Sequence, residues 1–303
     1  MIHQVLDPDF RSLLDEHAAL HVLATDFVFT EGPVWHPKDE CLLFSDIPPG
    51  IRHCWDGNRA SIALTPSNMG NGMTYDHALN LLVCEHATSS VARFSGGERQ
   101  VLASHFDGEE LNSPNDIVMA ADGAIWFSDP TYGRMPVFGK ERPCQLDFCG
   151  VYRIPPAGGA LELVVDKLMF TQPNGLCFSP DEKLLYINDT EQANIRIFDV
   201  EDGKLKNVRM FAEGIADTAQ PNRRPDGMKC DALGNIWCTG PGGLWVYAAD
   251  GRLLGKIAVP EVVANLHWGG KNWRTLFITA STSLYALEIK VGPHKESFMS
   301  GYI

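Results

Sequence analysis

Short hydrophobic runs alternate with polar turns along most of the chain, and many pairs of runs begin with an acidic or amide residue. The stretch TEGPVWHPKDECLLFSD, residues 30–46, shows the pattern: Glu31 precedes an apolar pair, a polar turn follows, and a second hydrophobic run ends the stretch. Two β-rich runs around a turn that is rich in Asp, Gly, Asn and Pro predict a β-hairpin. Whether the carboxylate has a function depends on whether the pattern recurs.

The hairpin pattern occurs six times. Clear copies are SPNDIVMAADGAIWFSD at residues 113–129, QPNGLCFSPDEKLLYIND at 172–189 and RPDGMKCDALGNIWC at 224–238, and weaker copies begin near residues 71 and 265. The leading polar residues are Glu31, Asn71, Asn115, Asn174, Asp226 and Asn265, with spacings of 40, 44, 59, 52 and 39 residues. Further strand-like runs fill the gaps, so each unit holds about four strands in about 40 to 50 residues, which is typical of a β-propeller blade.

The repeat therefore predicts an all-β fold, a six-bladed β-propeller that forms a single domain over residues 1–303. Residues 1–24 precede the first repeat as an N-terminal extension, and one short helix is expected there, near residues 9–19. In a propeller the innermost strand of each blade lines the central channel, and equivalent positions lie at the same height. The six leading residues should therefore face one another in a ring at one end of the channel.

The donor types in this ring favour a hard metal ion. Two carboxylates that lie close together raise each other's pKa unless a cation lies between them. Four members of the ring offer oxygen donors without sulfur or imidazole: Glu31, Asn115, Asn174 and Asp226. This set favours one Ca²⁺ ion, with Mg²⁺ or Mn²⁺ next and Zn²⁺ as a further alternative. Two other interpretations stay open: the Pro-Asn-Gly and Pro-Asp-Gly motifs only form turns, or the ion is a structural plug.

Composition narrows the class of protein. The chain has 303 residues, is 45% apolar and 21% charged, and carries a formal net charge of −13, which argues against nucleic acid or an anionic membrane as a partner. Residues 1–24 lack a basic region followed by an apolar stretch, and no run approaches the length of a membrane span, so neither a signal peptide nor a membrane segment is expected. Eight cysteines without a C-x-x-C pair indicate reduced thiols in a cytoplasmic protein.

Other catalytic motifs are poorly supported. The sequence lacks a G-x-S-x-G elbow, an H-E-x-x-H motif and a P-loop, and Gly70-Asn71-Gly72 lacks the third glycine and the βαβ setting of a dinucleotide fingerprint. Five of the histidines, at residues 36, 53, 77, 86 and 105, show no ligand spacing. His267 lies two residues after Asn265 and is kept as a candidate for substrate contact.

These motifs resemble the gluconolactonase family, which includes regucalcin (senescence marker protein) and luciferin-regenerating enzyme. The matching stretches run from TEGPVW at residue 30 to VVANLHWGG at 262–270 in the same order and blade phase, and the form SPND…FSDPTYG is most similar to bacterial gluconolactonases. The resemblance implies a six-bladed propeller, a lactonase that acts on small-molecule sugar lactones, and one divalent metal ion in the channel. It implies the same four ligands, and related diisopropyl-fluorophosphatases use a similar set.

The chain departs from the family pattern at the places that contact substrate. Ser113 stands where animal regucalcins carry a substrate-binding arginine, and the loop after Asp129 reads Thr131-Tyr132-Gly133 without a matching acidic residue. Lys229 stands where the fluorophosphatases hold a second calcium partly through an aspartate, so no second calcium is expected there. The candidate substrate-binding residues are Ser113, Asp129, Tyr132, Asn71, Asn265 and His267.

The expected reaction is attack of water on a lactone carbonyl that a metal ion polarises. Asp226 is the expected general base, because it lies between the rigid Pro225 and the permissive Gly227, and Glu31 is the alternative. The insertion at residues 131–148 is too long for a hairpin and is expected to cover the site and shape the substrate pocket. Two other functions stay open: hydrolysis of organophosphates or aryl esters at the same metal, and a non-enzymatic propeller that binds a protein or sugar.

Overall fold

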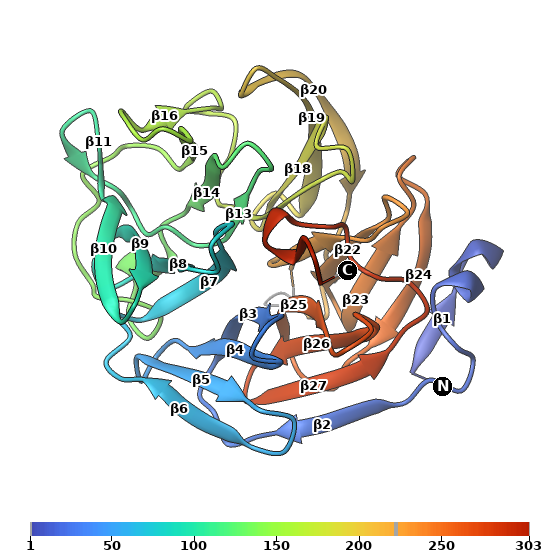
Figure 1. The fold of residues 1–303 in the computed structure, drawn as a ribbon. Helices are drawn as coiled ribbons and strands as arrows, with labels where there is room; N and C mark the ends of the chain where they lie inside the picture. Colours follow the sequence, from blue (N-terminus) through green and yellow to red (C-terminus); the bar gives the residue numbers. More distant parts are fainter. Residues whose placement is uncertain (1, 221–223, 303) are drawn as a thin grey trace.

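Six antiparallel sheets surround a central axis in the computed structural model, which describes residues 2–220 and 224–302 (Figure 1). In blades 1 to 4 the strands pair in sequence order, from an inner strand at the axis to an outer strand at the rim, and in blades 5 and 6 a strand from the N-terminal extension is added at the rim. The inner strands β3, β7, β13, β17, β21 and β25 contact one another around the axis, and β25 contacts β3. The predicted all-β, six-bladed propeller is therefore confirmed.

The first three blades follow the chain. Blade 1 contains β3 (Thr30–His36), β4 (Cys41–Asp46), β5 (Ile51–Trp55) and β6 (Ala60–Leu64). Blade 2 contains β7 (Gly70–Tyr75), β8 (Leu81–Glu85), β9 (Ser90–Ser95) and β10 (Glu98–Ala103). Blade 3 contains β13 (Ile117–Met119), β14 (Ile125–Asp129), β15 (Gly150–Ile154) and β16 (Glu162–Leu163), and a small hairpin of β11 (His105–Phe106) and β12 (Glu109–Glu110) precedes it.

The last three blades include both ends of the chain. Blade 4 contains β17 (Pro173–Phe178), β18 (Leu184–Asp189), β19 (Asn194–Glu201) and β20 (Lys204–Glu213). Blade 5 contains β21 (Met228–Cys230), β22 (Ile236–Gly240), β23 (Gly243–Tyr247) and β24 (Leu253–Ala258), with β1 (His3–Val5) as a fifth strand. Blade 6 contains β25 (Val263–Gly269), β26 (Thr275–Ala280) and β27 (Ser283–Glu288), and its outer strand is β2 (Leu20–Ala24) from the N-terminal extension.

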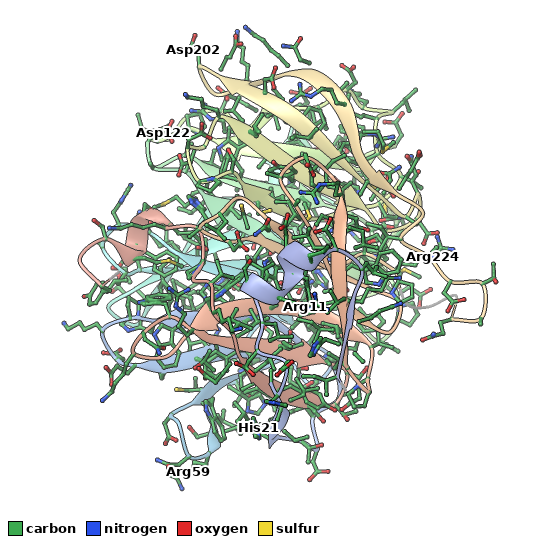
Figure 2. All side chains as sticks on the ribbon, turned by 90° about the vertical axis from the view of Figure 1, so that its right-hand side faces the viewer. Arg11, His21, Arg59, Asp122, Asp202 and Arg224 are labelled. Atoms are coloured by element: carbon green, nitrogen blue, oxygen red, sulfur yellow. The ribbon has the colours of Figure 1, made fainter. Side chains whose placement is uncertain are left out.

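The blades are held together by apolar side chains between neighbouring sheets. Trp126, Trp237 and Trp268 are almost completely buried, and the rings of Trp237 and Trp268 meet edge to face across the boundary of blades 5 and 6. Many charged side chains lie at the periphery, as Arg59, Asp122 and Asp202 do on exposed turns (Figure 2). The buried rings fix the angle between blades, and with it the spacing of the inner strands.

Irregular pairing at the start of the inner strands turns the leading residues toward the axis. The register of β3 against β4 shifts between Glu31 and Val34, and equivalent shifts occur in β7, β17 and β25. A bulge of this kind bends a strand and re-aims the side chains next to it. In blades 3 and 5 the leading residue instead precedes the inner strand.

Glycines that follow the leading residues allow neighbouring inner strands to approach closely. A Cβ atom on Gly32, whose φ is +53°, would lie 1.9 Å from the carbonyl oxygen of Asn71 in the next blade. A Cβ atom on Gly72 would lie 2.4 Å from the carbonyl oxygen of Asn115, to which the Gly72 amide donates at 2.8 Å. The same approach to the next leading residue occurs at Gly175 and Gly227. The Glu-Gly, Asn-Gly and Asp-Gly pairs therefore set the diameter of the ring.

The N-terminal extension differs from its prediction. The expected helix near residues 9–19 is wrong: the chain forms a 3-10 turn, η1 (Pro8–Ser12), that the Asp7 side chain caps, and it then continues irregularly to β2. Phe10, Leu13 and Leu14 of this segment are buried in the core, so tertiary packing decides its conformation. Apart from residues 1, 221–223 and 303, the chain contains no α-helix and no helix that could cross a membrane.

Residues after β27 cover the end of the channel opposite the ring (Figure 1). The His294 amide donates to the carbonyl of Cys230, and the Ala232 amide donates to the carbonyl of Gly292, which fixes this segment to blade 5. A last 3-10 turn, η3 (Ser297–Met299), buries Phe298 and Met299. The channel is therefore closed at this end.

Candidate active site

A pocket of about 470 Å³ opens at the ring end of the channel. Five of the six predicted ring residues line it: Glu31, Asn71, Asn115, Asn174 and Asp226. They come from five different blades and are separated by up to 195 residues in the sequence, and the structure brings them together in one pocket. The sixth, Asn265, does not line the pocket but donates a hydrogen bond from Nδ2 to Glu31 Oε2 at 3.1 Å.

The two carboxylates of the ring have different surroundings. Glu31 is only 2% exposed, and its Oε2 accepts from Asn265 and from the backbone amide of Gly32. Asp226 is half-buried, and Asn174 is the side chain that hydrogen-bonds to its carboxylate. The Asp226 backbone is fixed on both sides, because its amide donates to Thr239 Oγ1 at 2.7 Å and its carbonyl accepts from Asn188 Nδ2 at 2.6 Å. Asp226 is thus the more accessible carboxylate on a rigid backbone.

Burial and mutual repulsion make both carboxylates weak acids. Burial is the main cause that raises the pKa of Glu31 well above its usual value, and the nearby Asp226 and Asp116 raise it further. Burial and Asp116 also raise the pKa of Asp226 to about 7, although the hydrogen bond from Asn174 opposes the shift. Positive charge brought between the two groups would favour the ionised form of both.

The donor set fits a hard divalent cation. Asn174 is 3% exposed, and its Oδ1 is buried without a hydrogen-bond partner, while Nδ2 donates to Thr190 Oγ1 at 3.0 Å. A buried carbonyl oxygen without a donor is costly, and a cation would satisfy it. Within residues 2–220 and 224–302, no cluster of three or more His, Cys, Asp or Glu side chains could hold a metal. The candidate set combines two carboxylates with two amide oxygens, which suits Ca²⁺ or Mg²⁺.

The insertion at residues 131–148 forms one wall of the pocket. It contributes Tyr132, Met135 and Phe138 to the lining, and it begins with the 3-10 turn η2 (Tyr132–Arg134). Arg134 is buried and donates to backbone carbonyls of the segment before β13, including that of Asn112 at 2.6 Å. The expectation that this insertion shapes the pocket agrees with these contacts.

Two of the predicted substrate-binding residues hold this wall instead of lining the pocket. Ser113 is fully buried, and its hydroxyl donates to the carbonyl of Pro130 and accepts from the amide of Gly133. Asp129 is also fully buried, accepts from the backbone amides of Asn112 and Ser113, and has its pKa raised to about 7 by burial. A substrate could reach neither side chain without displacing the wall, whereas Asn71 and Tyr132 do line the pocket.

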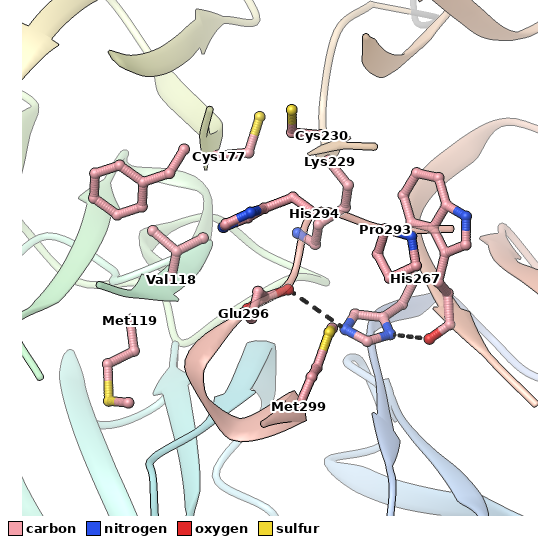
Figure 3. Close-up of a pocket in the computed structure, with 12 residues that line it drawn as sticks. Val118, Met119, Cys177, Lys229, Cys230, His267, Pro293, His294, Glu296 and Met299 are labelled. Atoms are coloured by element: carbon pink, nitrogen blue, oxygen red, sulfur yellow. Dashed lines mark hydrogen bonds and ion pairs between the residues drawn. The ribbon is translucent and has the colours of Figure 1, made fainter. Parts of the chain in front are cut away.

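His267 belongs to a second, much smaller cavity of about 20 Å³ further along the inner strands (Figure 3). Its Nδ1 lies 2.6 Å from the carbonyl oxygen of Trp268, and its Nε2 lies 3.9 Å from Glu296 Oε1 of the C-terminal segment. Burial lowers the pKa of His267 to about 3. Lys229 lines the same cavity, and its Nζ lies 3.6 Å from Asp116 Oδ2. Lys229 therefore balances the charge of Asp116 behind the ring, and neither His267 nor Lys229 lines the substrate pocket.

Several residues that line the pocket were not identified from the sequence. Ile47, His86, Thr190 and Ser281 each line the pocket, and each directly follows the second strand of its blade. The signal that could have found them is the repeat itself, because the turn after the second strand opens at the same end of the blade as the leading residue of the first. Phe29, Met135, Phe138, Glu191, Arg224 and Val262 complete the lining. Phe29 and Arg224 each lie two residues before a leading residue, whereas no repeated position marks the other four.

Comparison with known proteins agrees with the fold and identifies the family. Residues 29–282 match the model of one protein family, described as the SMP-30/Gluconolactonase/LRE-like region. The chain belongs to this family. The matched range begins two residues before Glu31 and ends after the sixth inner strand, so it contains all six ring residues.

Three known proteins are similar to this chain over most of its length. A gluconolactonase from Zymomonas mobilis is 31% identical over 93% of this chain and 85% of its own length. The pentonolactonase XacC from Haloferax volcanii is 30% identical over 86% of this chain and 84% of its own length. The solved structure of a gluconolactonase from Xanthomonas campestris superposes with a TM-score of 0.88 at 32% identity and covers 95% of both chains.

Proposed function

We propose that this protein is a lactonase that opens sugar lactones to the corresponding acids. The observation that carries the proposal is the pocket floor, where two carboxylates and two amide side chains from four blades converge in a chain whose similar relatives are named gluconolactonase and pentonolactonase. A pocket of about 470 Å³ accepts a hexose lactone with room for water. The expected cytoplasmic location stays a prediction.

The residues that would hold one divalent cation, with Ca²⁺ favoured, are Glu31, Asn115, Asn174 and Asp226. When bound, the cation would polarise the lactone carbonyl and stabilise the negative charge that develops on its oxygen. Asn265 and the Gly32 amide keep Glu31 oriented toward this centre. Thr190 performs the same task for Asn174, because its hydroxyl accepts from Asn174 and donates to the Pro225 carbonyl at 2.8 Å.

Asp226 is the proposed general base. Its carboxylate is half-buried and lines the pocket, whereas Glu31 is almost inaccessible and already accepts two hydrogen bonds. Asp226 would remove the proton from the attacking water and return it to the departing ring oxygen.

Hydrolysis of aryl esters or organophosphates is the second candidate. The observation that favours it is the apolar part of the lining, in which the rings of Phe29 and Phe138 meet at 4.9 Å next to Ile47. A panel of aldonolactones, aryl esters and fluorophosphates, followed by acid release with and without a chelator, separates the two activities. Acid release from the aldonolactones that is no faster than in buffer alone would refute the lactonase proposal.

Asn174→Ala is expected to weaken binding of Ca²⁺ by about tenfold or more, because changes to groups that only support a ligand already cost about 10- to 100-fold. Isothermal titration measures the affinity. The matched control is Asn194→Ala, which removes another buried amide with an unpartnered Oδ1 that does not line the pocket. Unchanged affinity and activity in Asn174→Ala would show that the proposed ligand set is wrong.

Binding of Ca²⁺ should weaken as the pH falls below about 7. The pKa of Asp226 is raised to about 7 in the free protein, and that of Glu31 is raised as well, so as the pH falls below 7 Asp226 increasingly holds a proton that the cation must displace. Affinity at pH 5.5 should be at least about tenfold lower than at pH 7.5, since one proton released per ion changes affinity about tenfold per pH unit. Isothermal titrations in buffers of different ionisation enthalpy give the number of protons released per bound ion. A finding of no proton release at pH 6 would contradict the assignment of these carboxylates as ligands.

A further inference from the structure

His86 connects the insertion wall to the ring through both of its nitrogens. Its Nδ1 lies 2.7 Å from the carbonyl oxygen of Phe138, and its Nε2 lies 3.1 Å from Nδ2 of Asn71. A carbonyl oxygen can only accept a hydrogen bond, so Nδ1 carries the proton. Nε2 of the neutral ring is then an acceptor, and it receives a hydrogen bond from Asn71. The two partners together fix one tautomer.

This tautomer fixes the orientation of the Asn71 amide. The opposite orientation would bring Asn71 Oδ1 against the unprotonated Nε2 of His86, and two acceptors would face each other. With Nδ2 engaged, Oδ1 is the amide atom left to accept a hydrogen bond. It is buried, and among the described residues it has no partner, although Asn71 lines the pocket. A buried acceptor without a donor points to a bound group that donates one.

The surroundings leave His86 little freedom to move. It is 1% exposed, and a Cβ atom on Gly133 would lie 2.7 Å from its Cβ and Cγ, so the insertion backbone packs directly on the imidazole. Arg142 Nη2 lies 3.4 Å from the carbonyl oxygen of His86 and donates to Ser89 Oγ at 2.5 Å. A ring held in this way can hold the amide in one orientation before the substrate arrives.

We infer that His86 is a positioning residue that orients Asn71 so that its Oδ1 accepts a hydrogen bond from a hydroxyl of the substrate. The inference rests on the proposed function and narrows it: the site selects lactones that carry ring hydroxyls over lactones without them. A site built to hydrogen-bond a hydroxyl disfavours an analogue that lacks it, because the buried acceptor then stays unpaired. The insertion and the ring act together in this selection, since His86 needs the Phe138 carbonyl to keep its tautomer.

The test compares D-glucono-1,5-lactone with δ-valerolactone, which has the same ring without hydroxyls. Selectivity is the ratio of the two kcat/KM values. In His86→Leu it should fall about tenfold, mainly through a higher KM for gluconolactone, because Asn71 loses the partner that holds its amide. His86→Gln should recover part of the selectivity, since one side-chain amide can accept from Asn71 and donate to Phe138. His53→Gln, a change to a buried histidine in the core of blade 1, is the matched control and should keep the wild-type ratio.

Three outcomes would overturn the inference, and they differ from one another. Equal losses for both lactones in His86→Leu and in His86→Gln would mean that His86 only supports the fold. A weaker affinity for Ca²⁺ in Asn71→Ala would mean that Asn71 Oδ1 holds the cation and not a hydroxyl. If the wild-type protein hydrolyses neither lactone, the proposed function fails first, and the inference fails with it. Thermal unfolding of each variant shows that the ratio is measured on folded protein.

Discussion

Asp226→Asn should lower lactone turnover by about a hundredfold or more, even at saturating Ca²⁺. An amide oxygen can still coordinate a cation, so part of the metal affinity survives and excess Ca²⁺ fills the site. An amide cannot take a proton near neutral pH, so the attacking water loses its general base. The measurement is gluconolactone hydrolysis across a calcium titration, with correction for the uncatalysed rate.

Glu31→Gln is the matched comparison, because it makes the same chemical change at the other carboxylate of the ring. Glu31 is 2% exposed and already accepts from Asn265 and Gly32, so it is expected to act as a ligand only. Excess Ca²⁺ should therefore restore most of the activity that Glu31→Gln loses. Full recovery of turnover in Asp226→Asn at high calcium would show that Asp226 is not the general base. Glu31 or bulk water would then take that role.

Phe10→Ala should lower the free energy of unfolding by about 3–5 kcal/mol, although Phe10 lies outside the range that matches the family. The ring is 1% exposed and packs on the backbone of Gly255 in β24, where an added Cβ atom would lie 2.8 Å from it. Removal leaves a cavity between the N-terminal extension and blade 5. Urea unfolding measures the change.

Leu6→Ala is the control in the same segment, because Leu6 is 47% exposed and should contribute less than about 1 kcal/mol. Equal and small effects for Phe10→Ala and Leu6→Ala would mean that the extension does not stabilise the propeller. A large effect of Phe10→Ala on stability with normal kcat in the folded protein would separate this role from the chemistry in the channel.

The repeat carried most of what the sequence could predict. A leading residue such as Asn174 is recognisable because Pro173, Gly175 and the following strand recur in phase with it. Phase then gives position in space, since equivalent residues of a propeller meet at one end of the channel. This is why five residues far apart in sequence could be assigned to one site.

Features that depend on contacts outside the repeat could not be predicted from the sequence. The N-terminal segment was expected to be helical, but Phe10 and Leu13 pack into the core in a 3-10 turn that no periodicity announces. Ser113 lies in the repeated motif and was a candidate for substrate contact, but its hydroxyl donates to the Pro130 carbonyl and accepts from the Gly133 amide. His86 gave no ligand spacing, because its two partners, Asn71 and Phe138, are 67 residues apart and belong to different structural elements.

The outer strand of blade 6 has a consequence for synthesis on the ribosome. Ala24 of β2 pairs with Leu284 of β27, so roughly 13 to 50 s separate their translation at roughly 5–20 residues per second. Blades 1 to 4 consist of strands that are neighbours in the sequence, so each can form as it emerges from the ribosome. β2 stays unpaired until β27 has been translated. A nascent chain released before residue 284 would expose both β2 and the unfinished last sheet, and such unpaired edges attract other chains.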